Sequence, residues 1–233
     1  METEFIYWRH HTPIGIKVEE ISGGEDKSGT LWQQMALQVY AENGREEYRE
    51  IGHFPSGAPF LHNSAERISI SHCPHKLIIA TLPPAPDVEL NSFSPLTALG
   101  VDVESSHRKQ ILKLRERFLS EAELDMIPAD NVAANITAWT AKEALYKAAM
   151  VMSPDFRKAI ELQSLPVPAP EEVWLRYISS NEKPDIASAF GRAFIFLPSG
   201  IKLKMNLYSY MSGEDIVTMA YADDTLRFQN TGS

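Results

Sequence analysis

The sequence predicts a mixed α/β (α+β) protein with a helix-covered sheet in each half of the chain. Two observations lead to this fold class. Several short runs alternate apolar and polar residues with a period of two, which is typical of half-buried strands. Two longer stretches, at residues 29–49 and 131–150, contain few helix breakers and favour helices. Each half therefore has the order strand, helix, strands, although no internal sequence repeat is recognisable.

The N-terminal half begins with a strand predicted at residues 13–20, where isoleucine and valine alternate with small or charged residues. The helix predicted to follow, from residue 29, is interrupted at Asn43, because an Asn-Gly pair favours a turn. Prolines and glycines make residues 54–60 a turn-rich connector.

Two adjacent strands, joined as a hairpin, are predicted at residues 68–72 and 77–82. A proline-rich loop at residues 83–95 then leads to a strand at residues 96–103. This order places the central strand of the chain directly after a hairpin.

Two carboxylates, Asp102 and Glu104, alternate at the end of the strand 96–103. Because successive side chains of a strand point to opposite faces, both carboxylates project from one side. Carboxylate oxygens are ligands that Mg²⁺ takes. An acidic strand end is also common as a solvated edge, so the pair by itself leaves both interpretations open.

The segment 107–118 is amphipathic with helical spacing and carries most of the local positive charge. Ser120 is predicted to cap a short helix that has acidic residues in its first turn. Asn131 or Asn135 caps a long helix that runs to about Met150.

Three side chains of this long helix, Trp139, Glu143 and Lys147, recur at i, i+4 and i+8 and share one face. Trp139 is most simply a core anchor, and Glu143 with Lys147 alone would be an ordinary surface ion pair. Lys142 is predicted to be a solvated charge. Spacing alone does not show that this helix face meets the acidic strand end.

The pattern returns to strands after Pro154. The four predicted strands are residues 173–177, 192–197, 201–210 and 216–221. The polar tail after Asp224 is predicted to fray.

The composition excludes several classes of function. A net charge of −9 argues against nucleic-acid binding, which needs a basic face. No run of about 18 apolar residues predicts a membrane span, and the acidic N-terminus lacks the features of a secretory signal. The single cysteine, Cys73, fits a reducing cytoplasm and is predicted to be a small buried residue. We therefore expect a cytoplasmic protein.

Four motifs occur in one order along the chain. They are Ile68-Ser69-Ile70-Ser71-His72, Gly100-Val101-Asp102-Val103-Glu104, Arg117-Phe118-Leu119-Ser120-Glu121-Ala122-Glu123, and Trp139-Thr140-Ala141-Lys142-Glu143-Ala144-Leu145-Tyr146-Lys147. This set resembles the 4′-phosphopantetheinyl transferase superfamily, in its surfactin-synthetase-activator-like (Sfp-type) branch. The resemblance covers residues 50–150.

The resemblance implies two similar subdomains with a ligand cleft between them, here residues 1–98 and 99–224, followed by a flexible tail at 225–233. It also implies an activity: Mg²⁺-dependent transfer of the 4′-phosphopantetheine arm of coenzyme A to a serine of an apo acyl or peptidyl carrier protein. Adenosine 3′,5′-bisphosphate is released, as in holo-acyl-carrier-protein synthases. Mn²⁺ is a substitute cation, and a monomer is expected.

The resemblance assigns Asp102, Glu104 and Glu143 to the metal. Glu143, or a water bound to the metal, would take the proton of the carrier serine, and Lys147 would neutralise or protonate the leaving phosphate. Metal polarisation and positioning suit displacement at phosphorus, where charge must be neutralised.

Coenzyme A is expected to contact Ser71, His72 and Lys147. His72 is alternatively a satisfied core residue of its strand. The chain departs from the family pattern at Ala58, where many relatives have a lysine, and at Cys73, where a small hydroxyl residue is usual. These departures leave open a non-catalytic module that binds coenzyme A or carrier proteins. A different Mg²⁺-dependent phosphotransferase or phosphohydrolase is a second alternative.

The basic segment after the acidic strand end is the predicted carrier-docking site, because carrier proteins are acidic. It is equally well interpreted as a solvated helix face. Its predicted contact residues are Arg108, Lys109, Ile111, Lys113 and Arg115, with Leu112 as an apolar alternative to Ile111.

Overall fold

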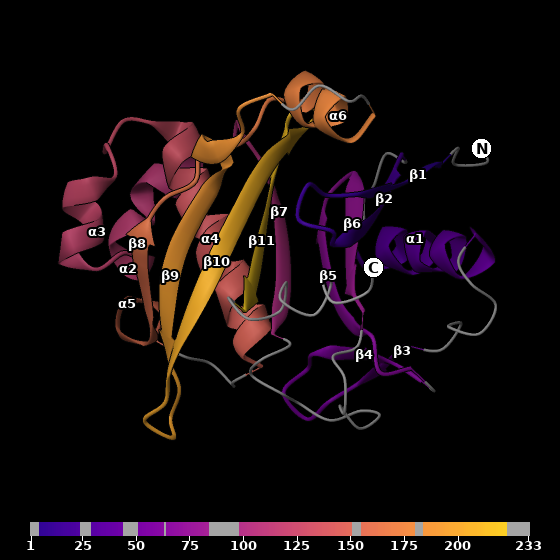
Figure 1. Ribbon diagram of the computed structural model, residues 1–233, viewed down its shortest axis with the longest axis horizontal. Coiled ribbons are helices and arrows are strands. Elements are labelled where there is room, and N and C mark those ends of the chain that lie inside the picture. Colours follow the sequence, from indigo (N-terminus) through magenta and orange to yellow (C-terminus); the bar gives the residue numbers. More distant parts are fainter. Residues whose placement is uncertain are drawn as a thin grey trace, which may run out of the picture.

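The fold is a mixed α/β arrangement in which two antiparallel sheets carry helices (Figure 1), as the sequence predicts. We describe a computed structural model of the chain. The structure describes residues 5–23, 29–43, 51–62, 64–83, 98–150, 155–179 and 184–222. For residues 29–33 and 178 it describes the backbone alone. The predicted tail at 225–233 and nearly all of the predicted loop at 83–95 lie outside the described residues.

The first sheet has four strands in the order β1-β2-β6-β5. Its strands are β1 (Ile6–His11), β2 (Lys17–Ser22), β5 (Arg67–Cys73) and β6 (Lys76–Leu82). The predicted hairpin is confirmed, because β5 and β6 pair antiparallel across a tight turn. Strand β1, which pairs with β2, was not predicted.

Helix α1 (Gly29–Asn43) packs on the outer face of this sheet. Its Ala36 and Tyr40 lie against Ile21 of β2 and Ile79 of β6. The helix ends at Asn43, where the Asn-Gly pair predicts an interruption. The connector after it contains two short paired strands, β3 (Ile51–His53) and β4 (Pro59–Leu61), around the predicted turn.

The second sheet has five strands in the order β7-β11-β10-β9-β8. Its strands are β7 (Leu99–Ser105), β8 (Ile160–Ser164), β9 (Phe190–Phe196), β10 (Lys202–Ser212) and β11 (Asp215–Ala222). The three predicted strands at the end of the chain are confirmed, and β8 was missed.

The strand predicted at residues 173–177 is wrong, because this segment is helix α6 (Glu171–Ser179). The Pro170 carbonyl accepts its first backbone hydrogen bonds, and two glutamates occupy its first turn. Trp174 is buried, and its indole N–H donates to the Met211 carbonyl at 2.9 Å. The tertiary contact of Trp174 and the glutamates of the first turn both favour the helix, against the strand preference of its aromatic and β-branched residues.

Helix α4 (Val132–Ala149) covers the outer face of the second sheet. Asn131 caps it through its side-chain oxygen, which accepts from the Ala134 N–H. The helix approaches β7 so closely that a Cβ built at Gly100 would lie 1.9 Å from the Ala144 carbonyl oxygen. Glycine at this point of the strand therefore fixes the helix against the position of Asp102, two residues further on.

The segment predicted as one amphipathic helix at 107–118 is instead a 3₁₀ turn, η3 (Lys109–Lys113), followed by one turn of helix, α2 (Arg115–Phe118). Helix α3 (Glu121–Met126) follows, and Ser120 and Glu123 form its capping box, so the predicted cap is confirmed. The remaining short elements are α5 (Phe156–Ala159) and η4 (Ala187–Ala189).

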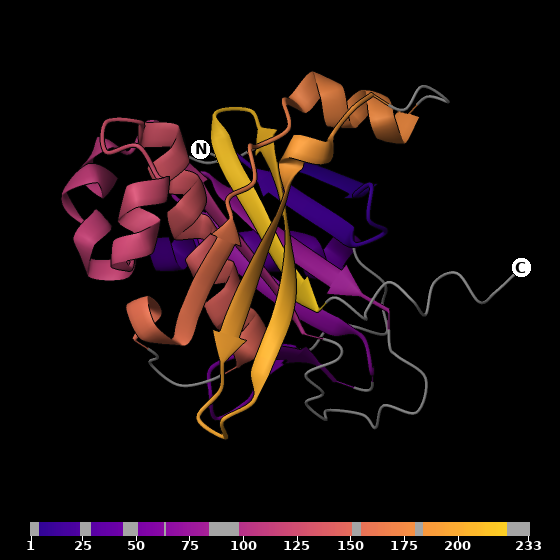
Figure 2. The same ribbon diagram turned by 60° about the vertical axis from the view of Figure 1, so that its left-hand side comes forward.

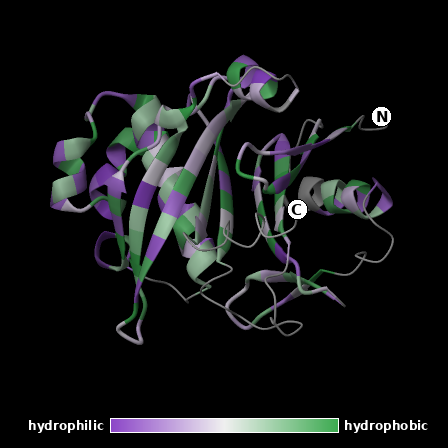
Figure 3. Ribbon diagram, in the orientation of Figure 1, coloured by the Kyte–Doolittle hydropathy of each residue, from purple (hydrophilic) through white to green (hydrophobic). Residues whose placement is uncertain are grey.

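The two sheets pack against each other, with their helices on the outer faces (Figures 1 and 2). Figure 3 shows hydrophobic residues along β6 and β7 and hydrophilic residues on α2. Val101 and Val103 of β7 join Ile78 and Ala80 of β6 in this central core. The predicted subdomain boundary near residue 98 stays a prediction. None of the described helices has both the length and the apolar character needed to cross a membrane.

Candidate functional site

One groove at the junction of the two sheets holds the residues that the sequence singled out. It is lined from three elements, β5, β7 and α4. The lining residues are Ile70, Ser71, His72, Asp102, Val103, Glu104, Trp139, Glu143 and Lys147. The structure thus brings the acidic strand end and the polar face of α4 together, which spacing alone could not show.

Strand β5 is joined to β7 through serine side chains. The Val101 N–H donates to Ser69 Oγ at 3.0 Å, and the Val103 N–H donates to Ser71 Oγ at 3.3 Å. β7 is the edge strand of its sheet, so its outer N–H groups have no neighbouring strand to bond to. The two serine hydroxyls accept hydrogen bonds from these groups instead. The alternating serines of β5 therefore set the groove where the two sheets meet.

Asp102 is the central acceptor of the groove. Its Oδ1 accepts a hydrogen bond from Ser71 Oγ and one from Lys147 Nζ, each at 2.7 Å. Lys147 Nζ also donates to the Val101 carbonyl at 3.0 Å. Asp102 is buried, so these partners compensate for the removal of its charge from water. One oxygen of Asp102 remains for another ligand.

Glu104 lies beside Asp102 and forms an ion pair with Arg108. Burial raises the pKa of Glu104, and the Asp102 charge raises it further, against the opposing effect of Arg108 and a hydrogen bond from Trp139. Arg108, predicted to dock the carrier, is therefore engaged with a predicted metal ligand.

Among the groove residues, Glu143 has the pKa that departs most from its ordinary value. Burial, followed by the charge of Asp102, raises the pKa of Glu143 to about 7, although Lys147 opposes the shift. A carboxyl group with a pKa near neutrality exchanges protons readily at that pH. This property suits a general base, the role that the resemblance implies for Glu143.

His72 and Ser71, neighbours on β5, differ in what they can contact. The His72 side chain is exposed at the groove, and burial of its ring together with the Lys147 charge lowers its pKa. Ser71 is only 5% exposed, and its hydroxyl is bonded to Asp102 and the Val103 N–H. Ser71 therefore positions Asp102, whereas contact of either residue with coenzyme A stays a prediction.

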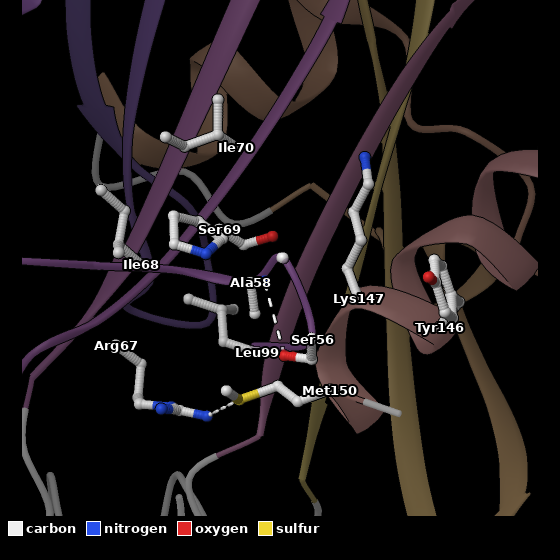
Figure 4. Close-up of a pocket in the computed structure, with 12 residues that line it drawn as sticks. Ser56, Ala58, Arg67, Ile68, Ser69, Ile70, Leu99, Tyr146, Lys147 and Met150 are labelled. Carbon is white, nitrogen blue, oxygen red and sulfur yellow. Dashed lines mark hydrogen bonds between the residues drawn. The ribbon is translucent and has the colours of Figure 1, made fainter. Parts of the chain in front are cut away.

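A second cavity of about 310 Å³ adjoins the groove and shares Ile70 and Lys147 with it. Figure 4 shows Arg67 of β5 and Met150 at one end of this cavity, with the Lys147 ammonium at the other. The Arg67 guanidinium donates to the Met150 sulfur at 2.6 Å, and burial lowers the pKa of Arg67. Ala58, at the position where the resemblance leads one to expect a lysine, also lines the cavity.

The residues of the predicted docking segment differ in their exposure to solvent. Ile111 is 1% exposed and belongs to the core, so its prediction as a carrier contact is wrong. Arg115 donates to the Asn135 side chain at 3.2 Å and to the carbonyls of Leu124 in α3 and Ile127 just after it, which gives its guanidinium a structural role. Lys109 and Lys113 are exposed and remain available to a partner.

Lys142 is fully buried, so its prediction as a solvated charge is wrong. Its ammonium donates to Glu123 Oε2 at 2.7 Å and to the carbonyls of Phe156 and Ile160. Glu123 Oε1 accepts from the Leu162 N–H at 2.8 Å. This pair joins α3, α4 and β8 beneath the site. Cys73 is buried as predicted, and burial raises the pKa of its thiol to about 12.

The donor set of the groove fits a hard divalent cation. Asp102, Glu104 and Glu143 offer oxygens without a thiol or imidazole, which is the chemistry of Mg²⁺ sites. The two nearby cations, Lys147 and Arg108, are outnumbered by the three carboxylates, so negative charge is in excess in the groove. In the part of the chain that the structure describes, these oxygens do not all lie within 4.8 Å of one another. Asp102 instead contacts Lys147, and Glu104 contacts Arg108.

Arg67 is the site residue that the motifs did not place. The sequence contains a signal for it, because Arg67, Ser69 and Ser71 alternate along β5. Residues two apart on a strand share a face, so the serines that meet β7 imply that Arg67 lies on the same side.

Residues 98–188 match the model of the 4′-phosphopantetheinyl transferase superfamily. This segment contains Asp102, Glu104, Glu143 and Lys147, whereas His72 lies before it. No curated protein matches the chain. The match supports an enzyme of the phosphopantetheinyl transferase type, and the Sfp-type branch stays a prediction.

Proposed function

We propose that this protein transfers the 4′-phosphopantetheine arm of coenzyme A to a serine of an apo carrier protein. The observation that carries the proposal is the single groove in which Asp102, Glu104, Glu143 and Lys147 meet. All four residues lie in the segment that matches the superfamily. The serine oxygen forms a new bond to phosphorus, and the bond to adenosine 3′,5′-bisphosphate breaks.

Mg²⁺ would be held by Asp102, Glu104 and Glu143. When bound, it neutralises charge on the pyrophosphate and polarises the phosphoryl oxygen. The chain itself supplies the positioning. Ser71 and Lys147 hold one oxygen of Asp102, so that the other can face a ligand.

Glu143 accepts the proton of the carrier serine. Its position in the groove and its pKa of about 7 support this role. Lys147 lies between the groove and the adjoining cavity, where its ammonium neutralises the leaving phosphate.

Arg67 and His72 are the groups that we infer hold coenzyme A on the β5 side. Arg67 lines the adjoining cavity together with Ala58, so an arginine from β5 takes the place of the usual lysine. An arginine binds phosphate through two parallel donors, which compensates for the loss of a lysine at this point.

The acidic carrier docks on the exposed side of η3. Lys109 and Lys113 provide the positive charge there, next to the half-buried Leu112. The buried Ile111 and the engaged Arg115 are left out of this surface.

The test is the mass gain of an apo carrier protein incubated with this protein, coenzyme A and Mg²⁺. A gain equal to one phosphopantetheine group, lost in Asp102→Ala and Glu143→Ala, supports the proposal. Absence of any gain with fatty-acid, polyketide and peptide carriers, together with calorimetric binding of coenzyme A, would instead establish the non-catalytic module. Hydrolysis of coenzyme A without a carrier would indicate a phosphohydrolase.

A further inference from the structure

A second cluster of metal-ligating side chains lies where the β5–β6 turn meets the start of β11, on residues that do not line the groove. It consists of Cys73, His75 and Asp215. Their ligand atoms all lie within 4.8 Å of one another, and this is the one such group among the described residues. Cys73 and His75 belong to the first sheet's hairpin, and Asp215 belongs to the second sheet.

One carboxylate oxygen of Asp215 has no hydrogen-bond partner in this cluster. Its Oδ2 lies 3.0 Å from His75 Nε2, but its Oδ1 is buried without a hydrogen-bond partner. The residue is 1% exposed. A buried carboxylate oxygen without a partner is costly, so its presence points to a ligand.

Lys76 contacts the same carboxylate oxygen as His75. Its ammonium lies 3.2 Å from Asp215 Oδ2 and donates to the carbonyl and hydroxyl oxygens of Ser212, each at 2.6 Å. The Ser212 hydroxyl in turn donates to Glu20 Oε2 at 2.5 Å. Lys76 therefore helps to hold the Asp215 carboxylate in place through Oδ2, and Oδ1 is left without a hydrogen-bond partner.

We propose that Cys73, His75 and Asp215 bind a zinc ion that links the two sheets. A thiolate, an imidazole and a carboxylate form a donor set that zinc takes, and hard cations such as Mg²⁺ do not favour thiolate. Pro74 fixes the backbone between the two ligands of the hairpin. Three protein ligands leave a fourth position for water.

The charges of the cluster support a divalent cation. Cys73 binds as the thiolate, and its proton is released to solvent. The thiolate and the Asp215 carboxylate together balance the charge of Zn²⁺. Lys76 then remains to balance Glu20, with which it shares Ser212. His75 is partly exposed, with 52% of its side-chain surface accessible, so the ion has a path from solvent.

The mechanical consequence is a link between two sheets that otherwise meet through side-chain packing and hydrogen bonds. Because the ion binds the folded chain, it raises the midpoint of thermal unfolding in proportion to the logarithm of its concentration over Kd. This site is independent of the proposed transfer reaction.

The test uses the full chain after treatment with a chelator. We expect one equivalent of Zn²⁺ to bind, measured by competition with a chromophoric chelator, and to raise the unfolding midpoint. Co²⁺ as a probe should give thiolate-to-cobalt charge-transfer absorption. Absence of this absorption and of any Zn²⁺-dependent midpoint shift in the wild type would overturn the proposal.

Variants assign the ligands. His75→Ala removes an exposed side chain and should weaken Zn²⁺ binding at least about tenfold, and Cys73→Ser should abolish the charge-transfer band. His53→Ala removes another exposed histidine and should change neither measurement. Glu143→Gln should also leave Zn²⁺ binding at this site unchanged. Zn²⁺ affinity that is equal in wild type and His75→Ala would contradict the site.

Discussion

Lys147 Nζ and Asp102 Oδ1 lie 2.7 Å apart and join helix α4 to strand β7 at the junction of the two sheets. The two residues are separated by 45 positions in the sequence. Their contact shows that the acidic strand end and the polar helix face form one site. Because Ser71 and Lys147 both bind Oδ1 of Asp102, the other carboxylate oxygen can bind a ligand.

The first prediction concerns the carboxylates of the groove. Asp102→Asn and Glu143→Gln should each reduce kcat/KM for carrier modification about a hundredfold or more, because each removes charge where the transition state needs it. The rate is followed by mass spectrometry of the carrier. Glu121→Gln, on the exposed first turn of α3, is the matched control and should retain activity. Full activity of Glu143→Gln would remove the proposed base.

The second prediction uses the titration of Glu143. Its pKa in the folded chain is about 7, against an ordinary value of 4.5, so the folded state binds this proton more tightly. The stabilisation is complete below about pH 4.5 and is lost as the pH rises through about 7. Since partial exposure screens the effect, Glu143→Gln should raise the free energy of unfolding by ~1–2 kcal/mol at about pH 8 and change it little at about pH 4.

Urea titration at the two pH values measures this difference. Glu116→Gln, an exposed carboxylate on α2, is the control and should show no such pH dependence. Mg²⁺ should stabilise the wild type at the higher pH more than it stabilises Glu143→Gln. An equal gain at both pH values would show that the variant acts through packing and not through its charge.

The sequence predicts the β5–β6 hairpin and helix α4 well, because local patterns specify both. Alternation specifies the hairpin, and Asn131 specifies the start of the helix. It predicts α6 wrongly, because the strand preference of its residues is overridden by Trp174, whose indole binds a carbonyl on β10. That contact joins distant parts of the chain, whereas the two glutamates of the first turn are a local helix signal that the strand prediction did not use.

In the candidate site, too, some features follow from local patterns and others depend on contacts between distant parts of the chain. Asp102 and Glu104 share a strand face, which a period of two predicts. Lys142 stands next to Glu143 and looks equally polar in the sequence, yet it is fully buried. Its partner Glu123 is 19 residues away in the chain, so its burial depends on how α3 packs against α4. The resemblance to the superfamily linked the acidic strand end to the Glu143 and Lys147 face of the helix, but it did not predict the burial of Lys142.

The third prediction separates these two lysines of α4. Lys142→Met leaves Glu123 buried without its cation and should lower the free energy of unfolding by about 3–5 kcal/mol. Lys147→Met leaves the buried Asp102 with Ser71 as a partner, and the Lys147 ammonium is itself partly exposed, so the variant should lower it by less, about 1–2 kcal/mol, but should abolish most of the transfer activity. Urea unfolding and the carrier assay are measured on both variants. A larger loss of stability in Lys147→Met than in Lys142→Met would contradict this assignment.

The fourth prediction concerns the contact between β7 and α4. Gly100→Ala would place a Cβ 1.9 Å from the Ala144 carbonyl oxygen, so the helix must move. We expect a loss of about 2–4 kcal/mol of unfolding free energy, at the upper end of overpacking costs. Gly213→Ala is the control, because its Cβ meets nothing within 4 Å and only the positive φ of +60° opposes it. Urea unfolding should show a smaller loss there, about 1 kcal/mol. Equal losses would mean that strand and helix are not in tight contact.

The fifth prediction tests the docking surface on η3. Reversing both exposed charges, Lys109→Glu with Lys113→Glu, should raise KM for an acidic carrier about tenfold or more and leave kcat nearly unchanged, because the groove is untouched. The wild-type KM should rise with ionic strength, whereas that of the variant should depend on it weakly.

Lys158→Glu is the matched control, because this lysine is also exposed but lies on α5. It should leave KM for the carrier unchanged. KM for coenzyme A should be the same in all three proteins, since neither substitution reaches the cavity of Arg67. If the double reversal changes kcat and not KM, the basic residues act on the groove through Arg108 and Glu104, and the carrier docks elsewhere.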